Sequence, residues 1–149
     1  MNLCVDKDGV IVEWVRRQIP IVTDFGKCTA LGMVGADGAP LAAAVYHDYQ
    51  PHWESVMISF AAASPRWATR NTVGIFLRYP FADLKVHKLR AAVPHTNFRS
   101  LKLTGGVGFT KEGTLKDEFG RGQHAVLFRM FEQDFSRLYD GEKGRRLAA

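Results

Sequence analysis

Apolar residues recur along the chain at two different periods, one typical of helices and the other of strands. Helical spacing runs over 11–17 and again over 73–81. The prolines at positions 20 and 80 are expected to end these two helices, because proline has no N–H to continue the hydrogen-bond ladder. A third, shorter helix should begin after Asn97, a good N-cap residue, and end at the pair of glycines that follows.

Six further segments alternate between apolar and polar residues or form short apolar runs, as strands do. The predicted strands are 29–34, 41–46, 55–61, 88–93, 108–115 and 125–131. The chain order is therefore helix, hairpin, strand, helix, strand, helix and hairpin. This order predicts an α+β fold, in which helices flank a mixed, mostly antiparallel central sheet with a single βαβ crossover. A doubly wound nucleotide-binding fold would need more crossovers.

The length of the chain fits one domain. We expect this domain over 1–140, followed by a basic, flexible tail over 141–149. No apolar run is as long as a membrane span, and the N-terminus lacks the apolar core of a secretion signal, so a cytoplasmic protein is expected.

The formal net charge of +5 and the pI of about 9.4 favour an anionic partner. Nucleic acid is not favoured, because the basic residues are not interleaved with aromatic ones as in sheets that bind single strands. Cys4 and Cys28 lack metal-ligand spacing, and the five histidines have no recurring spacing with carboxylates. We therefore expect no metal.

Two stretches near the C-terminus carry the most specific pattern. They are Asn97-Phe98-Arg99-Ser100 and Gly108-Phe109-Thr110-Lys111-Glu112-Gly113-Thr114-Leu115-Lys116-Asp117. Together they resemble the N-x-x-S … G-F-x-x-E-G-x-L-R signature of the RimJ/RimL-like ribosomal-protein-alanine acetyltransferase branch of the GNAT superfamily. The predicted element order is also that of this superfamily.

This resemblance implies an N-acetyltransferase with a GNAT-like acyl-CoA N-acyltransferase fold. Such an enzyme transfers the acetyl group of acetyl-CoA to a primary amine, by direct attack within a ternary complex. The acceptor is a small molecule or a protein N-terminus. The alternative is a catalytically weakened GNAT-fold protein that binds CoA or acts as an interaction module.

The resemblance also places the acetyl-CoA site. The pantetheine arm would pair with the edge of the strand at Phe60, Ala61 and Ala62, and the diphosphate would meet the start of the following helix. The residues expected to bind the diphosphate are Arg66, Thr69, Arg70, Asn71 and Thr72. Relatives usually have glycines where this chain has Thr69 and Asn71. Asn97 and Ser100 match positions beside the cofactor arm.

The catalytic candidates are Glu54, His95 and Ser100, with His47, Asp48 and His52 as further possible bases. A base is needed because a lysine-type amine is charged at neutral pH. The family usually has a tyrosine as general acid a few residues beyond the serine, but 101–104 contains none. This absence supports the weakened-enzyme alternative.

Aromatic residues are the candidates for the acceptor pocket and for self-association. Trp14, Tyr49 and Trp53 are expected to line the pocket. A homodimer is a possible assembly, with Phe128, Met130 and Phe131 of the last hairpin as its contact surface.

Overall fold

The computed structural model describes residues 2–6, 9–19 and 24–140. The segment 141–149, expected to be a flexible tail, lies outside these residues. So does Pro20, which was expected to end the first helix. That helix, α1 (Val10–Gln18), ends just before it.

The described residues form one mixed sheet of seven strands, in the order β1-β2-β3-β4-β5-β7-β6. The strands are β1 (Asn2–Val5), β2 (Cys28–Val34), β3 (Pro40–Gln50), β4 (Ser55–Ala62), β5 (Lys88–Pro94), β6 (Thr110–Leu115) and β7 (Ala125–Phe131). Only β4 and β5 are parallel among the described pairs, since every other neighbouring pair is antiparallel. The predicted α+β class, with its mostly antiparallel sheet, is confirmed.

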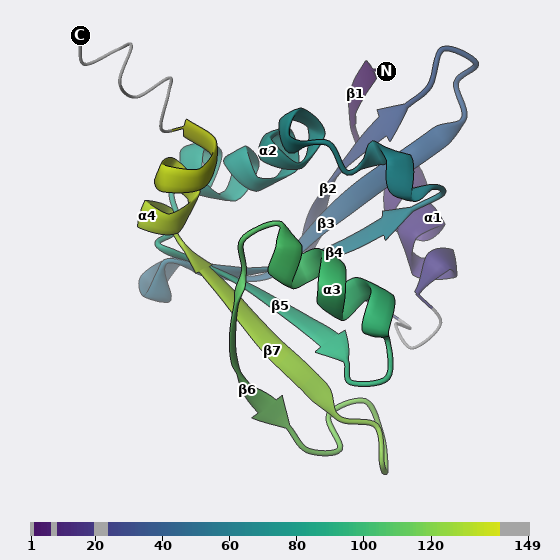
Figure 1. Cartoon of the computed structure of the whole chain (residues 1–149). Coiled ribbons are helices and arrows are strands. Elements are labelled where there is room, and N and C mark those ends of the chain that lie inside the picture. Colours follow the sequence, from purple (N-terminus) through teal and green to yellow (C-terminus); the bar gives the residue numbers. More distant parts are fainter. Residues whose placement is uncertain (1, 7–8, 20–23, 141–149) are drawn as a thin grey trace, which may run out of the picture.

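Helices cover both faces of this sheet (Figure 1). The crossover helix α2 (Arg70–Arg78) and α3 (Phe98–Gly106) pack on one face, over the larger apolar core. Helix α1 packs on the other face, over a smaller core that includes Val15, Val45 and Ala61. Each face of β4 therefore meets a different helix layer.

The alternation predicted for β4 decides which side chains reach which layer. Val56 and Ile58 are buried in the core under α2, and Phe60 packs against the same core. Ala61 is buried on the face of α1. Successive side chains of a strand point to opposite faces, so the other odd-numbered residues of β4 also face α1.

Helix α2 ends differently from the prediction. It stops at Arg78, and a π-helical turn, Tyr79–Asp83, continues the chain through Pro80. Because Pro80 has no N–H, the carbonyl of Phe76 loses the donor that a regular helix would supply. The buried hydroxyl of Tyr46, on β3, donates to this carbonyl at 2.5 Å instead. This bond ties the end of the crossover helix to the sheet.

Two peripheral segments were not predicted. Strand β1 is mostly exposed and shows no buried alternation that a periodicity search could detect. After β7 the chain forms α4 (Glu132–Phe135) and a π-helical turn, Ser136–Asp140. In Figure 1 this C-terminal segment lies beside α2. Phe135 contacts Phe81, with ring centroids 5.2 Å apart.

The contact surface suggested for a homodimer needs correction. Phe128 and Met130 are buried in the core under α2 and α3. Phe131 stacks on His87, with ring centroids 5.0 Å apart. Phe128 and Met130 therefore have no exposed apolar surface to offer a second copy.

We predict that Tyr46→Phe lowers the free energy of unfolding by about 1–3 kcal/mol, because the buried Phe76 carbonyl is then left without a donor. Tyr49→Phe is the matched control, since the Tyr49 hydroxyl donates to the Leu84 carbonyl at 3.3 Å on an exposed part of the surface. Urea unfolding of both variants measures the difference. Equal and small losses would contradict the role given to Tyr46.

Candidate active site

The sheet splits between its two parallel strands. In the described structure the β4–β5 ladder has three residue pairs and ends at Met57 and Arg90. Beyond that point β4 stays paired with β3 as far as Ala62, and β5 stays paired with β7 as far as Pro94. Backbone groups alternate in direction along a strand, so some N–H and C=O groups of β4 after Met57 point into the gap.

The residues predicted at this strand edge have different environments. The side chain of Phe60 packs against Trp67 and Phe76, with ring centroids 5.9 and 6.2 Å away. Only its backbone is therefore available at the gap. Ala61 is buried toward α1, and Ala62 is exposed at the end of the strand.

Hydrogen bonds of two threonines fix the start of α2. The Thr69 hydroxyl accepts the N–H of Thr72 at 3.2 Å, and the Thr72 hydroxyl accepts the N–H of Thr69 at the same distance, which is a capping box. The Thr72 hydroxyl also donates to the Trp67 carbonyl. The Thr69 side chain is thus held against its own helix, in a loop where relatives have glycine.

Arg66, Arg70 and Asn71 are exposed around this helix start. The N–H groups of the first helical turn have no partner within the helix and carry its positive dipole end. The two arginines add full positive charges. An anion would therefore be stabilised at this end of α2.

A pocket of about 290 Å³ opens beside the start of α2. It is lined by the start of α2, the end of α3 and the C-terminal turn: Ala68, Arg70, Val73, Gly106, Val107, Gly108, Leu138 and Tyr139. Gly108 has a φ of +115°, a backbone conformation that favours glycine over residues with a Cβ.

Tyr139 lies at the far end of α3 from Ser100. Its hydroxyl donates to the Val107 carbonyl, and the Arg70 guanidinium lies 5.7 Å from its ring centre. Burial raises the pKa of Tyr139. Ser100 is seven residues before Val107, about 10 Å along a helix axis. Tyr139 therefore lies near the C-terminal end of α3, away from Ser100.

The first turn of α3 lies next to the end of β5. The Asn97 side chain accepts the N–H of Ser100 at 3.1 Å, which confirms the predicted cap. His95 joins β5 to the start of β7: its N–H donates to the His124 carbonyl at 2.9 Å, and its Nδ1 accepts the N–H of His124 at 3.2 Å. His95 and Ser100 are both at the end where β4 and β5 separate.

Glu54 lies at the opposite end of the ladder. Its carbonyl accepts the N–H groups of His87 and Lys88, at 2.8 and 3.0 Å, and so aligns the start of β5. Its side chain is exposed. Ser59, the second residue beyond the last β4–β5 pair, is five residues farther on, about 16 Å along a strand. The structure does not bring Glu54 to the gap.

The three aromatic residues predicted for the acceptor pocket are not brought together. Trp14 packs on the small core under α1. Trp53, in the 3-10 turn Pro51–Trp53, is 74% exposed. The Tyr49 hydroxyl reaches the Leu84 carbonyl near the end of the π-helical turn.

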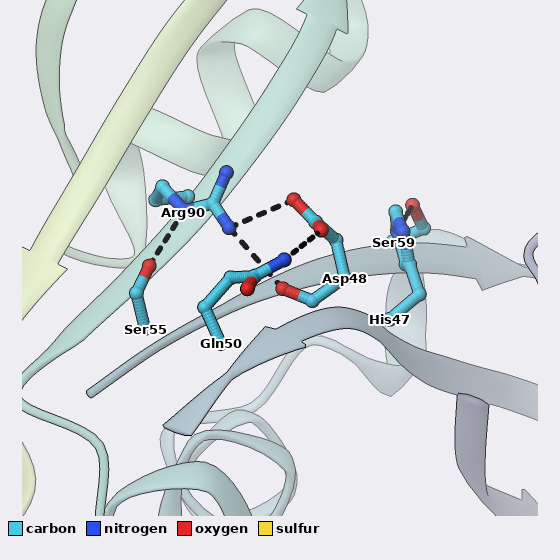
Figure 2. A network of polar contacts seen from close by, with 6 residues as sticks. All are labelled: His47, Asp48, Gln50, Ser55, Ser59 and Arg90. Atoms are coloured by element: carbon cyan, nitrogen blue, oxygen red, sulfur yellow. Dashed lines mark hydrogen bonds and ion pairs between the residues drawn. The ribbon is translucent and has the colours of Figure 1, made fainter. Parts of the chain in front are cut away.

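Polar side chains gather on the α1 face of β3, β4 and β5, at the closed end of the gap (Figure 2). The Arg90 guanidinium donates to the Ser55 hydroxyl at 2.7 Å and to the Asp48 carboxylate at 3.0 Å. Asp48 has a φ of 49° at a bulge in β3. The bulge turns its carboxylate toward Arg90, which lowers the pKa of Asp48 together with the hydrogen bond from Gln50.

His47 and Ser59 lie beside this ion pair. His47 Nε2 is 2.9 Å from the Ser59 hydroxyl oxygen. Burial lowers the pKa of His47, and the nearby Arg90 acts in the same direction, against the opposite influence of Asp48. The imidazole is therefore neutral at pH 7.

The sequence marked His47 only as one possible base among several. Nothing in the periodicity indicated Ser59 or Arg90, because their meeting depends on the register of three strands.

Cys28 lies opposite His47 in the β2–β3 register. Cross-strand neighbours are close enough to interact, so a thiolate–imidazole pair has to be considered. Burial, Asp6 and Asp24 all raise the pKa of Cys28, which keeps the thiol protonated. His47 Nε2 is directed at Ser59 instead. Cys28 is therefore a poor nucleophile here.

The described residues lack two further kinds of feature. Within 2–6, 9–19 and 24–140, no three His, Cys, Asp or Glu side chains are grouped so that they could hold a metal ion. In the same ranges, no helix has both the length and the apolar character needed to cross a membrane.

We predict that stability falls as the pH is lowered from 7 to 5, partly through His47. Below the ordinary histidine pKa of 6.5, the unfolded chain takes up a proton that partly buried His47 in the folded state resists, so protonation favours unfolding. His47→Gln should reduce this pH dependence while His52→Gln, at an exposed site, leaves it unchanged. Melting temperatures between pH 5 and 7 check this, and an unchanged slope in His47→Gln would contradict it.

Comparison with known proteins gives matches at the level of structure. No protein-family model and no curated protein matches the sequence. A mutant form of the spermidine/spermine N-acetyltransferase from Vibrio cholerae superposes with a TM-score of 0.76 at 16% identity, over 91% of this chain and 97% of that one. The ribosomal-protein-S5-alanine acetyltransferase from Vibrio fischeri superposes with a TM-score of 0.63 at 17% identity, over 72% of this chain and 63% of that one.

Both of these similar structures are GNAT acetyltransferases, and both matches are too distant in sequence to establish more than architecture. The parallel crossover and the helix layers around the seven-stranded sheet correspond to that architecture. The chain therefore has the GNAT acyl-CoA N-acyltransferase fold.

Proposed function

We propose that this protein is an acetyl-CoA-dependent N-acetyltransferase that acetylates a primary amine by direct attack. The observation that carries the proposal is the early end of the β4–β5 ladder at Met57 and Arg90. In this fold the gap offers unpaired backbone to a slender, hydrogen-bonding ligand, and the pantetheine arm of acetyl-CoA has that shape.

The start of α2 supports the same proposal. The diphosphate of CoA would lie at the first turn of α2, near the N–H groups of Arg70 and Asn71 and the charge of Arg66. Thr69 is compatible with this position because its hydroxyl is held by Thr72. The pocket beside Arg70 is lined partly by alanine and glycine, which leaves room for a ligand.

The chemistry requires two contributions from the chain. A backbone N–H of β4 in the gap would stabilise negative charge on the thioester oxygen as the amine attacks. Ser100, at the first turn of α3, is our candidate proton donor to the departing sulfur. Asn97 would contact the cofactor arm, as the signature at 97–100 implies.

The structural neighbours and the signature support a proposal for the acceptor class. The Vibrio cholerae neighbour is named for spermidine and spermine, and the Vibrio fischeri neighbour for an alanine of a ribosomal protein. We propose a polyamine or a protein N-terminus as the acceptor of this chain. The RimJ/RimL-like signature favours the N-terminus.

A second candidate function is a CoA-binding module without turnover. The absence of tyrosine from 101–104 favours it. The two candidates share the acetyl-CoA site and differ only in whether an amine is acetylated.

We predict that acetyl-CoA raises the melting temperature, since a ligand at 100 times its Kd adds about 2.7 kcal/mol to the free energy of unfolding. Arg70→Ala should weaken binding about tenfold or more, because a charge-assisted contact to phosphate is lost. Arg121→Ala removes an exposed arginine of the β6–β7 connection and is the control. Calorimetric titration measures both variants. No binding to the unaltered protein would end both candidate functions.

We predict turnover of acetyl-CoA with spermidine or with a peptide that begins with alanine. Release of free thiol and the mass of the acetylated amine are the measurements. Asn97→Ala should lower kcat/KM about tenfold, through loss of both the helix cap and the contact with the cofactor arm. Acetyl-CoA binding without any acetylated product would favour the binding module.

A further inference from the structure

His47 and Ser59 form a hydrogen-bonded pair that reaches the gap from the face opposite α2 and α3. Ser59 is the second residue of β4 beyond the last pair with β5. Its side chain points to the α1 face, as Ala61 does. His47 is paired with Met57, so its imidazole must lean along β4 toward the gap to reach Ser59 at 2.9 Å.

The packing of the sheet at this position does not require a titratable side chain. The Phe25 ring lies 5.1 Å from the imidazole and shields one side of it. An apolar side chain would fill such a place in the sheet at least as well, since a buried polar group costs free energy unless it is hydrogen-bonded. The pair instead lies beside the part of β4 that is no longer paired with β5.

The charged and titratable groups around His47 come from four elements. Asp48 follows it on β3, and Arg90 on β5 pairs with Asp48. Cys28 is opposite on β2 and stays protonated. On α1, which packs on the same face, Glu13 is paired with both Arg16 and Arg17, so this group carries one net positive charge.

We propose that Ser59 and His47 form a proton relay that accepts the proton of the acceptor ammonium, an inference that rests on the proposed acetyl transfer. The acceptor would then approach from the α1 face, while acetyl-CoA is held from the side of α2. The other candidate bases are less well placed. Glu54 is at the closed end of the ladder, and Nδ1 of His95 is already engaged with the backbone of His124.

Acetyl transfer moves two protons away from the acceptor nitrogen. The ammonium gives one proton to the Ser59 oxygen as the Ser59 hydroxyl proton passes to Nε2 of His47. The neutral nitrogen forms a bond to the thioester carbon and the carbon–sulfur bond breaks. The nitrogen gives its second proton to water, and the thiolate takes one proton from the Ser100 hydroxyl, which regains a proton from water. The products are the N-acetyl amine and the CoA thiol, and His47 returns its proton to water.

The relay predicts a specific pH profile. With the unaltered protein, kcat should fall on the acid side below pH 6.5, because a protonated imidazole cannot accept a proton and its pKa lies below the ordinary value. His47→Gln should lower kcat about 100-fold and abolish this acid limb. Ser59→Ala should lower kcat similarly, and Ser59→Thr, which keeps the hydroxyl, should restore most of it.

The experiment measures kcat from pH 5 to 9 with acetyl-CoA and either spermidine or the alanine-first peptide. Arg121→Ala, at an exposed position of the β6–β7 connection, is the control and should keep both kcat and the acid limb. Retained thermal stabilisation by acetyl-CoA shows that each variant is folded and binds the cofactor.

Each result decides between the two proposals. An active unaltered protein whose His47→Gln and Ser59→Ala variants keep kcat and the acid limb would overturn the relay and leave the acetyltransferase in place. An unaltered protein inactive with both acceptors would overturn acetyl transfer to these amines and the relay together. Loss of activity in Ser59→Ala without rescue in Ser59→Thr would also count against the relay.

Discussion

The arrangement of this protein depends on one constraint: β4 and β5 each stay fully paired with their outer neighbours and share only three residue pairs with each other. The sheet is thus two ribbons joined at one end. Backbone hydrogen-bonding groups between the ribbons are available to a ligand, which is unusual because sheets normally satisfy them internally. The candidate site exists because the ladder ends where it does.

The crossover helix must hold its position for this gap to be useful, since α2 connects the two ribbons. At its start, Thr69 and Thr72 close the capping box and direct the first turn. At its end, the Tyr46 hydroxyl compensates for the donor that Pro80 cannot provide. The aromatic contacts among Phe60, Trp67 and Phe76 fix the same helix to the β4 ribbon.

The two faces of the sheet have different chemistry at the gap. The α2 face offers a helix N-terminus, exposed arginines and a pocket closed by Tyr139, which suit an extended anion. The α1 face offers a neutral imidazole bonded to a hydroxyl, and an ion pair that leaves little net charge beside it. In our proposal the donor and the acceptor of the acetyl group therefore meet from opposite sides, and the α2 face matches the negative charge of its ligand.

Local periodicity determined much of this fold. The alternation of β4, the helical spacing of α2 and the cap at Asn97 are visible in the sequence because they depend on near neighbours. The element order, with one crossover, then predicted the mixed sheet. Strand β1 is short and mostly exposed, and α4 is short, so neither has a hydrophobic pattern long enough to detect. The C-terminal signature pointed to the correct architecture, although it covers a small part of the chain.

The candidate chemistry was decided by tertiary structure. The gap depends on where a ladder ends, which no single strand encodes. The pairs His47–Ser59, Arg90–Asp48 and Tyr139–Val107 join residues 12, 42 and 32 positions apart. A change of one residue in strand register would turn Ser59 to the opposite face and break the first of them. Residue types alone could therefore name His47 as one possible base among several, and our proposal for it depends on the register of β3, β4 and β5.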